Sequence, residues 1–179
     1  AELDQSWTFR HSYLIGKYQQ TVTAANGRVY FGGSQHSLFG YNSDSMTRTS
    51  GSITMYNGGD IQASTRSATG VVYASCHCSD YAFQDAYQYL TLGTTWTRAD
   101  EIQWVGGWDE ATGRQLGWTP YRLGSLRSTG AWALEMADDG ALWAGGDFNY
   151  SYTSLTAGQW SGGFVRMPAR NATAPAVPA

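Results

Sequence analysis

Residues 138–148 read DDGALWAGGDF, and this stretch decides what kind of fold the chain can form. Asp-Gly pairs favour hairpin turns because both central positions of the turn can adopt positive φ. The ALWA run that follows has the length and composition of a short, buried central strand. The Gly145-Gly146 pair then interrupts it. The stretch therefore predicts a turn, a buried strand and a second break.

Two earlier segments repeat this design. Residues 26–34 read NGRVYFGGS, and residues 69–76 read TGVVYASC. In each, a Gly precedes an aliphatic residue, an aromatic residue and then small residues. Gly27 and Gly70 are 43 positions apart, within the period of about 40–50 residues that is typical of a four-stranded propeller blade. The chain is therefore predicted to be a repeat protein.

The repeats divide the chain into a partial β-propeller over residues 1–168 and an Ala/Pro-rich linker or tail over residues 169–179. The second step between repeats, from Gly70 to Gly140, is longer than the first, and we expect an aromatic-rich insertion at residues 79–98. The expected units cover about 10–56, 60–120 and 127–168. The expected strands are 20–25, 37–41, 52–56, 60–64, 71–74, 102–108, an outer strand ending at 118–120, 132–136, 142–148 and 162–167.

The composition supports an all-β fold. The 179 residues are 15% aromatic and 14% charged, with 22 glycines, and such chains form strands joined by many turns. The net charge of −3 comes without a Lys/Arg cluster, so we expect no nucleic-acid partner. No apolar run approaches the roughly 20 residues of a membrane helix, so we expect no membrane insertion. Because the sequence begins at Ala1, we expect a mature or trimmed product.

Several residues are expected to be structural. The glycine pairs Gly32-Gly33 and Gly145-Gly146 would let backbones approach where sheets converge. The strands beside them are expected to be the innermost of each sheet. Trp118 is expected to insert between adjacent sheets, and Trp143 belongs to the third buried strand.

The two cysteines, Cys76 and Cys78, flank His77. In a strand the two thiols point to one face, where they could form a local disulfide or remain a buried thiol pair. A zinc site would need a fourth ligand that the local sequence does not supply. We expect the disulfide or the buried pair, and no metal site.

Beyond its composition, the chain resembles a known class of repeats. The motifs DGxLWxGGDF at residues 139–148, GGFxR at 162–166 and DxxTGxxxxWxP at 109–120 resemble the β-propeller repeats of large secreted bacterial surface proteins, which are similar to kelch and quinoprotein-type blades. The resemblance implies about three four-stranded antiparallel units, an orphan N-terminal strand at residues 6–9, and a secreted, extracellular or cell-surface location. No catalytic residues carry over from it.

Three units are too few for a ring, because propellers have typically four to eight blades. Either the orphan strand closes the third unit in a compact four-sheet ring, or another polypeptide chain or a homo-oligomer completes the propeller. We expect completion by another chain, since three blades alone would leave sheet faces and edges exposed.

The expected function is that of a non-catalytic extracellular scaffold or adhesion module, which is part of a multi-chain or proteolytically cleaved assembly. The alternative is a carbohydrate-binding, lectin-like propeller, in which exposed aromatic rings stack on sugars. Candidate ligand residues lie in the insertion and after the third glycine pair: Tyr81, Tyr87, Trp96, Asn149, Tyr150 and Tyr152.

A sialidase-like glycoside hydrolase is the third hypothesis. Asp138, Gly140 and Trp143 partly match the Asp-box turn of that family, but Met136 stands where its Ser or Thr belongs. Glycosidases also need two separated carboxylates, whereas the acidic residues here lie mostly in turns. We therefore expect no enzyme activity and no cofactor. Calcium in the Asp-rich turns stays an alternative, although Asp138-Asp139-Gly140 is short for a dedicated loop.

Overall fold

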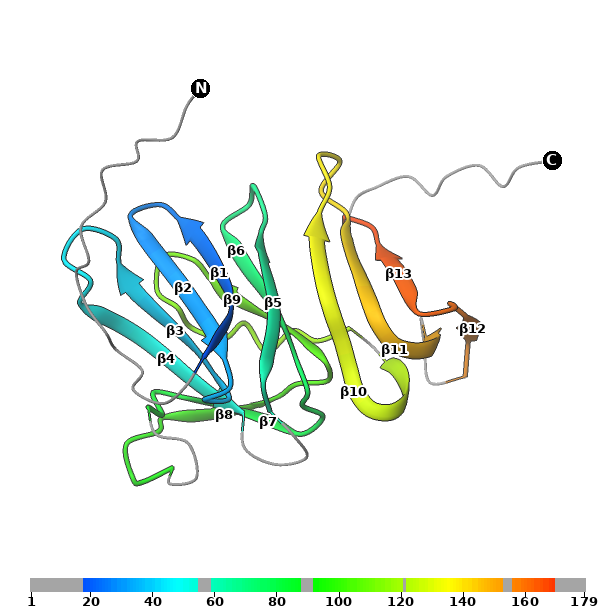
Figure 1. The fold of residues 1–179 in the computed structure, drawn as a ribbon, viewed down its shortest axis with the longest axis horizontal. Coiled ribbons are helices and arrows are strands. Elements are labelled where there is room, and N and C mark those ends of the chain that lie inside the picture. The colour runs from blue at the N-terminus through cyan, green and yellow to red at the C-terminus, as the bar shows by residue number, and fades with distance from the viewer. Residues whose placement is uncertain (1–17, 55–58, 88–91, 121, 153–155, 170–179) are drawn as a thin grey trace.

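The structure, a computed structural model, describes residues 18–54, 59–87, 92–120, 122–152 and 156–169. None of these residues lies in a helix, and the strands form three separate antiparallel sheets. The all-β prediction is therefore confirmed. Figure 1 shows the three sheets in order along the molecule, with the first and third at opposite ends.

The first sheet has six strands in the order β1-β2-β3-β4-β7-β8. Its first four strands follow one another as hairpins, and the first hairpin turns at Asn26-Gly27, where both residues have positive φ. The strands are β1 (Gln19–Ala25), β2 (Arg28–Gly33), β3 (Ser37–Asn42), β4 (Arg48–Thr54), β7 (Tyr81–Gln84) and β8 (Arg98–Glu101).

The second sheet has three strands in the order β5-β6-β9, and the third has four. In the third sheet β11 lies at the centre, pairing with β10 on one side and with β12 and β13 on the other. The strands are β5 (Ile61–Arg66), β6 (Val71–Cys76), β9 (Val105–Asp109), β10 (Arg122–Met136), β11 (Leu142–Tyr152), β12 (Gly158–Trp160) and β13 (Phe164–Met167).

The expectation of four strands in each unit was wrong for the first two sheets. The predicted insertion forms the β7–β8 hairpin, which leaves the second unit and adds to the first sheet along β4, with Ile53 opposite Phe83. This pairing covers an edge that would otherwise expose unpaired backbone groups. In the second unit the expected outer strand is reduced to an isolated bridge between Trp108 and Gln115. The orphan strand at residues 6–9 lies outside the described residues.

The three sheets share one irregularity at the same repeat position. The register shifts by one residue opposite the pair of small residues in β2, β6 and β11 (Gly32-Gly33, Ser75-Cys76 and Gly145-Gly146). The extra residues are Gln20 of β1, Gln62 of β5 and Trp132 of β10. A β-bulge of this kind bends a strand and increases its twist. Its recurrence shows that the three units are structural repeats as well as sequence repeats.

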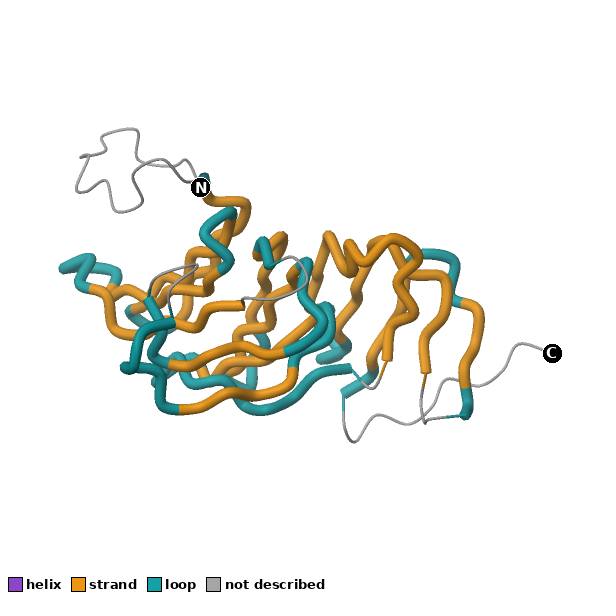
Figure 2. Tube along the Cα trace, turned by 90° about the horizontal axis from the view of Figure 1, so that it is seen from below, coloured by secondary structure: helices purple, strands orange, loops and turns teal. Residues whose placement is uncertain are grey.

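The glycine-punctuated strands β2, β6 and β11 are each central in a sheet, as their apolar sequences predict. They are not the innermost strands. Most contacts between sheets involve the preceding strands, because β5 packs against β1 and β2 on one side and against β10 on the other. Seen from below, the sheets again follow one another, and the described residues do not close into a ring (Figure 2).

Two hydrophobic clusters hold the row of sheets together. Tyr30 and Leu38 of the first sheet pack with Ile61, Val72 and Trp108 of the second. A second cluster joins the second sheet to the third; it contains Trp104, Val105, Leu123, Ala131, Leu134, Leu142, Ala144 and Phe148. Each interface is built from apolar side chains on facing sheets, as in other layered β proteins.

Two tryptophans near β9 reach in opposite directions from the second sheet. Trp108 lies in the cluster facing the first sheet, and its indole Nε1 donates to Ser52 Oγ at 3.0 Å. Trp104 lies in the cluster facing the third sheet, and its Nε1 donates to the carbonyl of Leu123 at 3.0 Å. Residues four apart in a regular strand share a face, but Trp104 has φ 64°. The positive φ turns its side chain to the opposite neighbour.

Candidate functional site

The aromatic residue three positions after the repeat glycine distinguishes the third sheet from the others. In the first two units this residue is covered by the next sheet. Tyr30 is buried, and its hydroxyl donates to the carbonyl of Glu110 at 2.8 Å. Tyr73 is half-buried: it packs edge-to-face on Trp118, with ring centroids 5.2 Å apart, and against the cluster that joins the second sheet to the third. The equivalent residue of the third unit, Trp143, is 39% exposed.

Trp143 lies on an outer face of the third sheet that we call the Trp143 face. It is made of Trp132, Ala133, Glu135, Trp143, Phe164 and Arg166. Trp143 stacks on Phe164 with ring centroids 6.4 Å apart. Trp132 and Phe164 are both more than half exposed. An exposed apolar patch of this kind commonly marks an interaction surface.

A groove of about 450 Å³ continues this aromatic surface. Trp132 and Trp160 lie on its lining with side chains 56% and 72% exposed. Polar groups of Arg127, Asp147 and Asn149 lie on the same lining. The groove thus offers flat aromatic rings beside hydrogen-bonding groups, which is the chemistry that recognises polar ligands with an apolar face.

Asp147 fixes the shape of this groove. Its Oδ2 accepts hydrogen bonds from the Arg127 backbone at 2.8 Å, from Thr129 Oγ1 at 2.8 Å and from Ser125 Oγ at 3.1 Å. These bonds hold residues 126–129 as a wide bulge within β10. Burial alone would raise the pKa of Asp147, but the bonds from Thr129, Arg127 and Ser125 together lower the pKa below its usual value. The carboxylate therefore stays ionised and organises the bulge.

The predicted ligand residues do not form one site. Asn149 lies in the groove with Trp132 and Trp160. Tyr150 and Tyr152 pair with each other, with ring centroids 6.4 Å apart. Tyr152 lines a separate hollow of about 350 Å³. Asn149 is the extra residue at a register shift of β11, between Phe148 and Tyr150.

The insertion places its aromatic residues on the first sheet. Phe83 packs against Tyr81 and Trp96, with ring centroids 6.4 and 5.5 Å away. Tyr87 lies instead over Phe39, and the guanidinium of Arg48 stacks on its ring at 4.2 Å. All three named residues keep exposed surface, with Tyr81 50%, Trp96 40% and Tyr87 39% exposed, but Tyr87 lies apart from the other two.

The glycines and the tryptophan Trp118 that were predicted to be structural differ in their local surroundings. A Cβ on Gly32 would lie 2.3 Å from Ile61 Cγ2, so this glycine permits the close approach of the first two sheets. Cβ atoms on Gly33 and Gly146 would meet the backbone of the bulged neighbouring strands. Gly145 has no such close neighbour. Trp118 packs partly buried between the second and third sheets.

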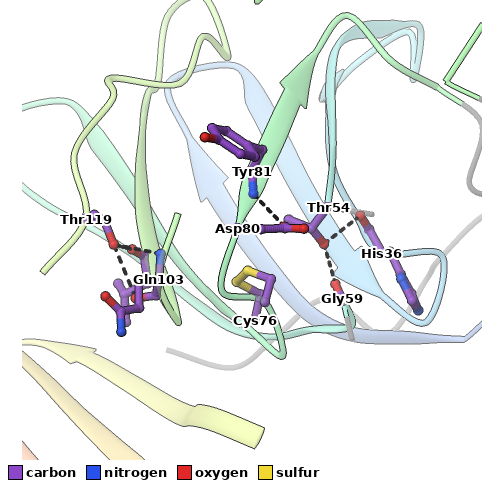
Figure 3. Close-up of a disulfide and its surroundings, with 10 residues drawn as sticks. His36, Thr54, Gly59, Cys76, Asp80, Tyr81, Gln103 and Thr119 are labelled. Carbon is purple, nitrogen blue, oxygen red and sulfur yellow. Dashed lines mark hydrogen bonds between the residues drawn. A yellow bond between two sulfur atoms is a disulfide. The ribbon is translucent and has the colours of Figure 1, made fainter. Parts of the chain in front are cut away.

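Cys76 and Cys78 are joined by a disulfide and are fully buried (Figure 3). The turn that contains them is anchored to Trp104 by two backbone hydrogen bonds of 2.9 Å. Nearby, Thr119 Oγ1 accepts from the Gln103 backbone at 2.8 Å and donates to the Val105 carbonyl at 2.9 Å. The disulfide leaves neither sulfur as a thiolate ligand for zinc.

The sequence did not identify the main groove residues. Trp132 and Trp160 were not among the candidates, and neither was Arg127. Trp132 occupies the bulge position that Gln20 and Gln62 hold in the other units, but this equivalence can be recognised only from the strand register of the structure.

Among the residues that the structure describes, no three or more His, Cys, Asp or Glu side chains come together as a metal site. Within the same part of the chain, no helix has the length and hydrophobicity to cross a membrane.

Glu110 connects the first two sheets electrostatically. Its carboxylate accepts hydrogen bonds from Arg66 on the second sheet and Asn26 on the first. The Arg66 hydrogen bond lowers the pKa of Glu110, which outweighs the opposing effect of burial. The ionised carboxylate is therefore favoured in the folded protein.

We expect Glu110→Gln to lower the free energy of unfolding at pH 7 by about 1 kcal/mol, kept small because water screens the partly exposed Arg66. Because the pKa of Glu110 is lower in the folded protein, the ionised carboxylate stabilises the fold fully at pH values above the ordinary Glu pKa of 4.5. This stabilisation is lost as the pH falls through the pKa of the folded protein. Denaturant titrations from pH 7 to pH 3 should therefore converge for wild type and variant. A difference that stays constant with pH would contradict this assignment.

No protein-family model matches the sequence, and no curated protein matches it. Two solved structures are similar in outline. The computationally designed Ika4 protein has a TM-score of 0.40 at 10% identity, covering 89% of this chain and 100% of its own. The computationally designed Ika8 protein has a TM-score of 0.34 at 10% identity, covering 80% of this chain and 48% of its own. Similarity at this level carries no conclusion about fold or function.

Proposed function

We propose that this protein is a non-catalytic extracellular scaffold or adhesion module, whose three sheets are blades of a β-propeller completed by other chains. One observation carries the proposal. Trp143 is exposed, whereas at the equivalent repeat positions Tyr30 is buried in the cluster shared with the second sheet and Tyr73 is half-buried against the cluster shared with the third. The third sheet thus presents a surface that the other two sheets use for association.

The roles of several acidic residues support a non-catalytic function. Asp109 Oδ1 accepts hydrogen bonds from both the backbone and the hydroxyl of Thr112, and these bonds lower its pKa. Asp139 Oδ1 accepts from the Ala141 backbone. Glu110 joins two sheets. These carboxylates are engaged in turns and sheet contacts. The Cys76–Cys78 disulfide supports an oxidising, extracellular location.

Native mass spectrometry of the protein from its natural source tests the proposal. We expect assemblies heavier than the single chain of 19.5 kDa, since association would cover the Trp143 face. Trp143→Glu in the native gene should shift the chain toward its own mass. A lone wild-type chain, or measurable glycosidase turnover, would contradict the proposed function.

Carbohydrate binding is the second candidate, favoured by the groove between Trp132 and Trp160. Truncating an aromatic side chain that is a binding hot spot costs about 2 kcal/mol or more. If glycans bind here, Trp160→Ala should weaken binding on a glycan array at least about tenfold. Trp96→Ala, at the separate hairpin cluster, should leave it unchanged. Loss of binding in Trp96→Ala alone would move the site to the insertion, and a blank wild-type array would remove this candidate.

A further inference from the structure

Building on the proposed function, we propose that the Trp143 face binds a second copy of this chain, on the outer face of that copy's first sheet. We call this second surface the Val22 face; it consists of Val22, Val29 and Phe31. Thr21 and Thr23 bond Ser64 of the second sheet, and Tyr30 packs toward it. The alternating side chains of Val22 and Phe31 therefore point away from the second sheet.

The register of the repeats identifies the Val22 face as half of a sheet contact. Ser64 of β5 pairs with Ala74, and Ser64 Oγ lies 2.6 Å from the hydroxyls of both Thr21 and Thr23 on the preceding sheet. In the third sheet Leu134 pairs with Ala144 at the equivalent position, and it packs in the cluster shared with the second sheet.

Val22 pairs with Phe31 and holds the same position in the first sheet. Its side chain is 60% exposed, whereas Ser64 and Leu134 contact a preceding sheet. The Val22 face of the first sheet therefore corresponds to the surface with which the second and third sheets contact the sheet before them. The Trp143 face corresponds to the surface with which the first and second sheets contact the sheet after them.

The Trp143 face and the Val22 face thus correspond to the two sides of the contact between neighbouring sheets, and they belong to the sheets at opposite ends of the row (Figure 1). In a second copy, the Val22 face would cover the Trp143 face of the first copy, and the Trp143 face would cover its Val22 face. The contact would repeat the one that the fold already uses between its first and second and its second and third sheets. Two copies bring six sheets, within the four to eight blades of known propellers. Each third sheet would then meet the partner's first sheet, giving a symmetric dimer with two equal contacts.

Two charged residues on the Trp143 face depart from the repeat. Arg166 pairs with Trp143 where Gly40 pairs with Tyr30 and Gly107 with Tyr73, and Glu135 is the second. Glu135 pairs with Trp143, whereas Thr23 pairs with Tyr30 and Thr65 with Tyr73. A carboxylate at this position must lose part of its hydration on association. We expect Glu135→Thr to restore the repeat residue and tighten the dimer.

Sedimentation velocity of the purified full-length chain tests the proposal. We expect a species of twice the 19.5 kDa chain mass, converted to monomer by Trp143→Glu and by Val22→Glu, each with at least about a 30-fold weaker dissociation constant. Trp96→Glu is the matched control, because Trp96 is 40% exposed and Trp143 39%. It should remain dimeric. Circular dichroism melts should show that each variant folds.

Mixing the two monomeric variants in equal amounts gives a second readout. In a pair of one Trp143→Glu chain and one Val22→Glu chain, one of the two contacts is wild type on both sides, so a one-to-one dimer should return. A dimer that survives Val22→Glu but not Trp143→Glu would show two Trp143 faces pairing together, and would overturn the proposal. So would a wild-type monomer at all concentrations.

These outcomes separate this inference from the proposed function. A wild-type chain that is monomeric when pure, but joins a different polypeptide in its native assembly, would refute the homodimer and leave the scaffold function standing. A dimer that hydrolyses a glycoside would support the homodimer and refute the non-catalytic scaffold function.

Discussion

Trp108→Ala should lower the free energy of unfolding by about 3–5 kcal/mol, a large part of the stability of a domain this size. Trp108 is 1% exposed in the cluster between the first two sheets. Removing the indole leaves a cavity there and also leaves Ser52 Oγ without its 3.0 Å donor. The loss should appear as a lower denaturant midpoint.

Two companions make this measurement specific. Trp108→Phe keeps most of the apolar contact and loses the hydrogen bond, so it should fall between wild type and Trp108→Ala. Trp160→Ala removes the same side chain from an exposed position and should change stability little. A loss below about 1 kcal/mol in Trp108→Ala would show that the first two sheets do not depend on this contact.

The second large effect is expected at Gly130→Ala, with a loss of about 2–4 kcal/mol from two sources. Gly130 has φ 65°, a conformation that costs a residue with a Cβ. A Cβ there would also lie 2.4 Å from Trp104 Cε3 and 3.0 Å from the Cys76 carbonyl. Because Trp104 joins the second sheet to the third, the substitution should loosen that interface.

Gly93→Ala provides the matched control for the backbone alone. Gly93 has φ 64°, and a Cβ there would meet nothing within 4 Å. The difference between the two variants therefore measures the close approach of Trp104 to the third sheet. Equal losses in Gly130→Ala and Gly93→Ala would assign the whole effect to backbone conformation and contradict the packing argument.

Local patterns predicted much of the secondary structure. Alternation in residues 20–25 and the Asn-Gly turn after them gave the β1–β2 hairpin, since register and turn are set by neighbouring residues. The long step between Gly70 and Gly140 indicated an insertion, which forms β7 and β8. Its destination on β4 could not be predicted, because that pairing joins residues far apart in sequence.

The candidate site was less predictable for the same reason. Asn149 was named, but its partners Trp132 and Trp160 come from two other strands. Tyr87 was named with Tyr81 and Trp96, but it stacks on Phe39 and not with their cluster around Phe83. Aromatic residues have the same sequence signature whether they fill a core or face a ligand. Only the fold shows which side of the sheet each one occupies.

The β-strands, the glycine-marked repeats and the turns can be predicted from local sequence, because they depend on φ preferences and side-chain alternation within a few residues. The tertiary structure alone decided that Tyr30 is covered and Trp143 exposed. It also decided that Trp104 and Trp108 reach opposite sheets. Burial depends on which sheet lies across from a side chain, and that neighbour comes from a distant part of the chain.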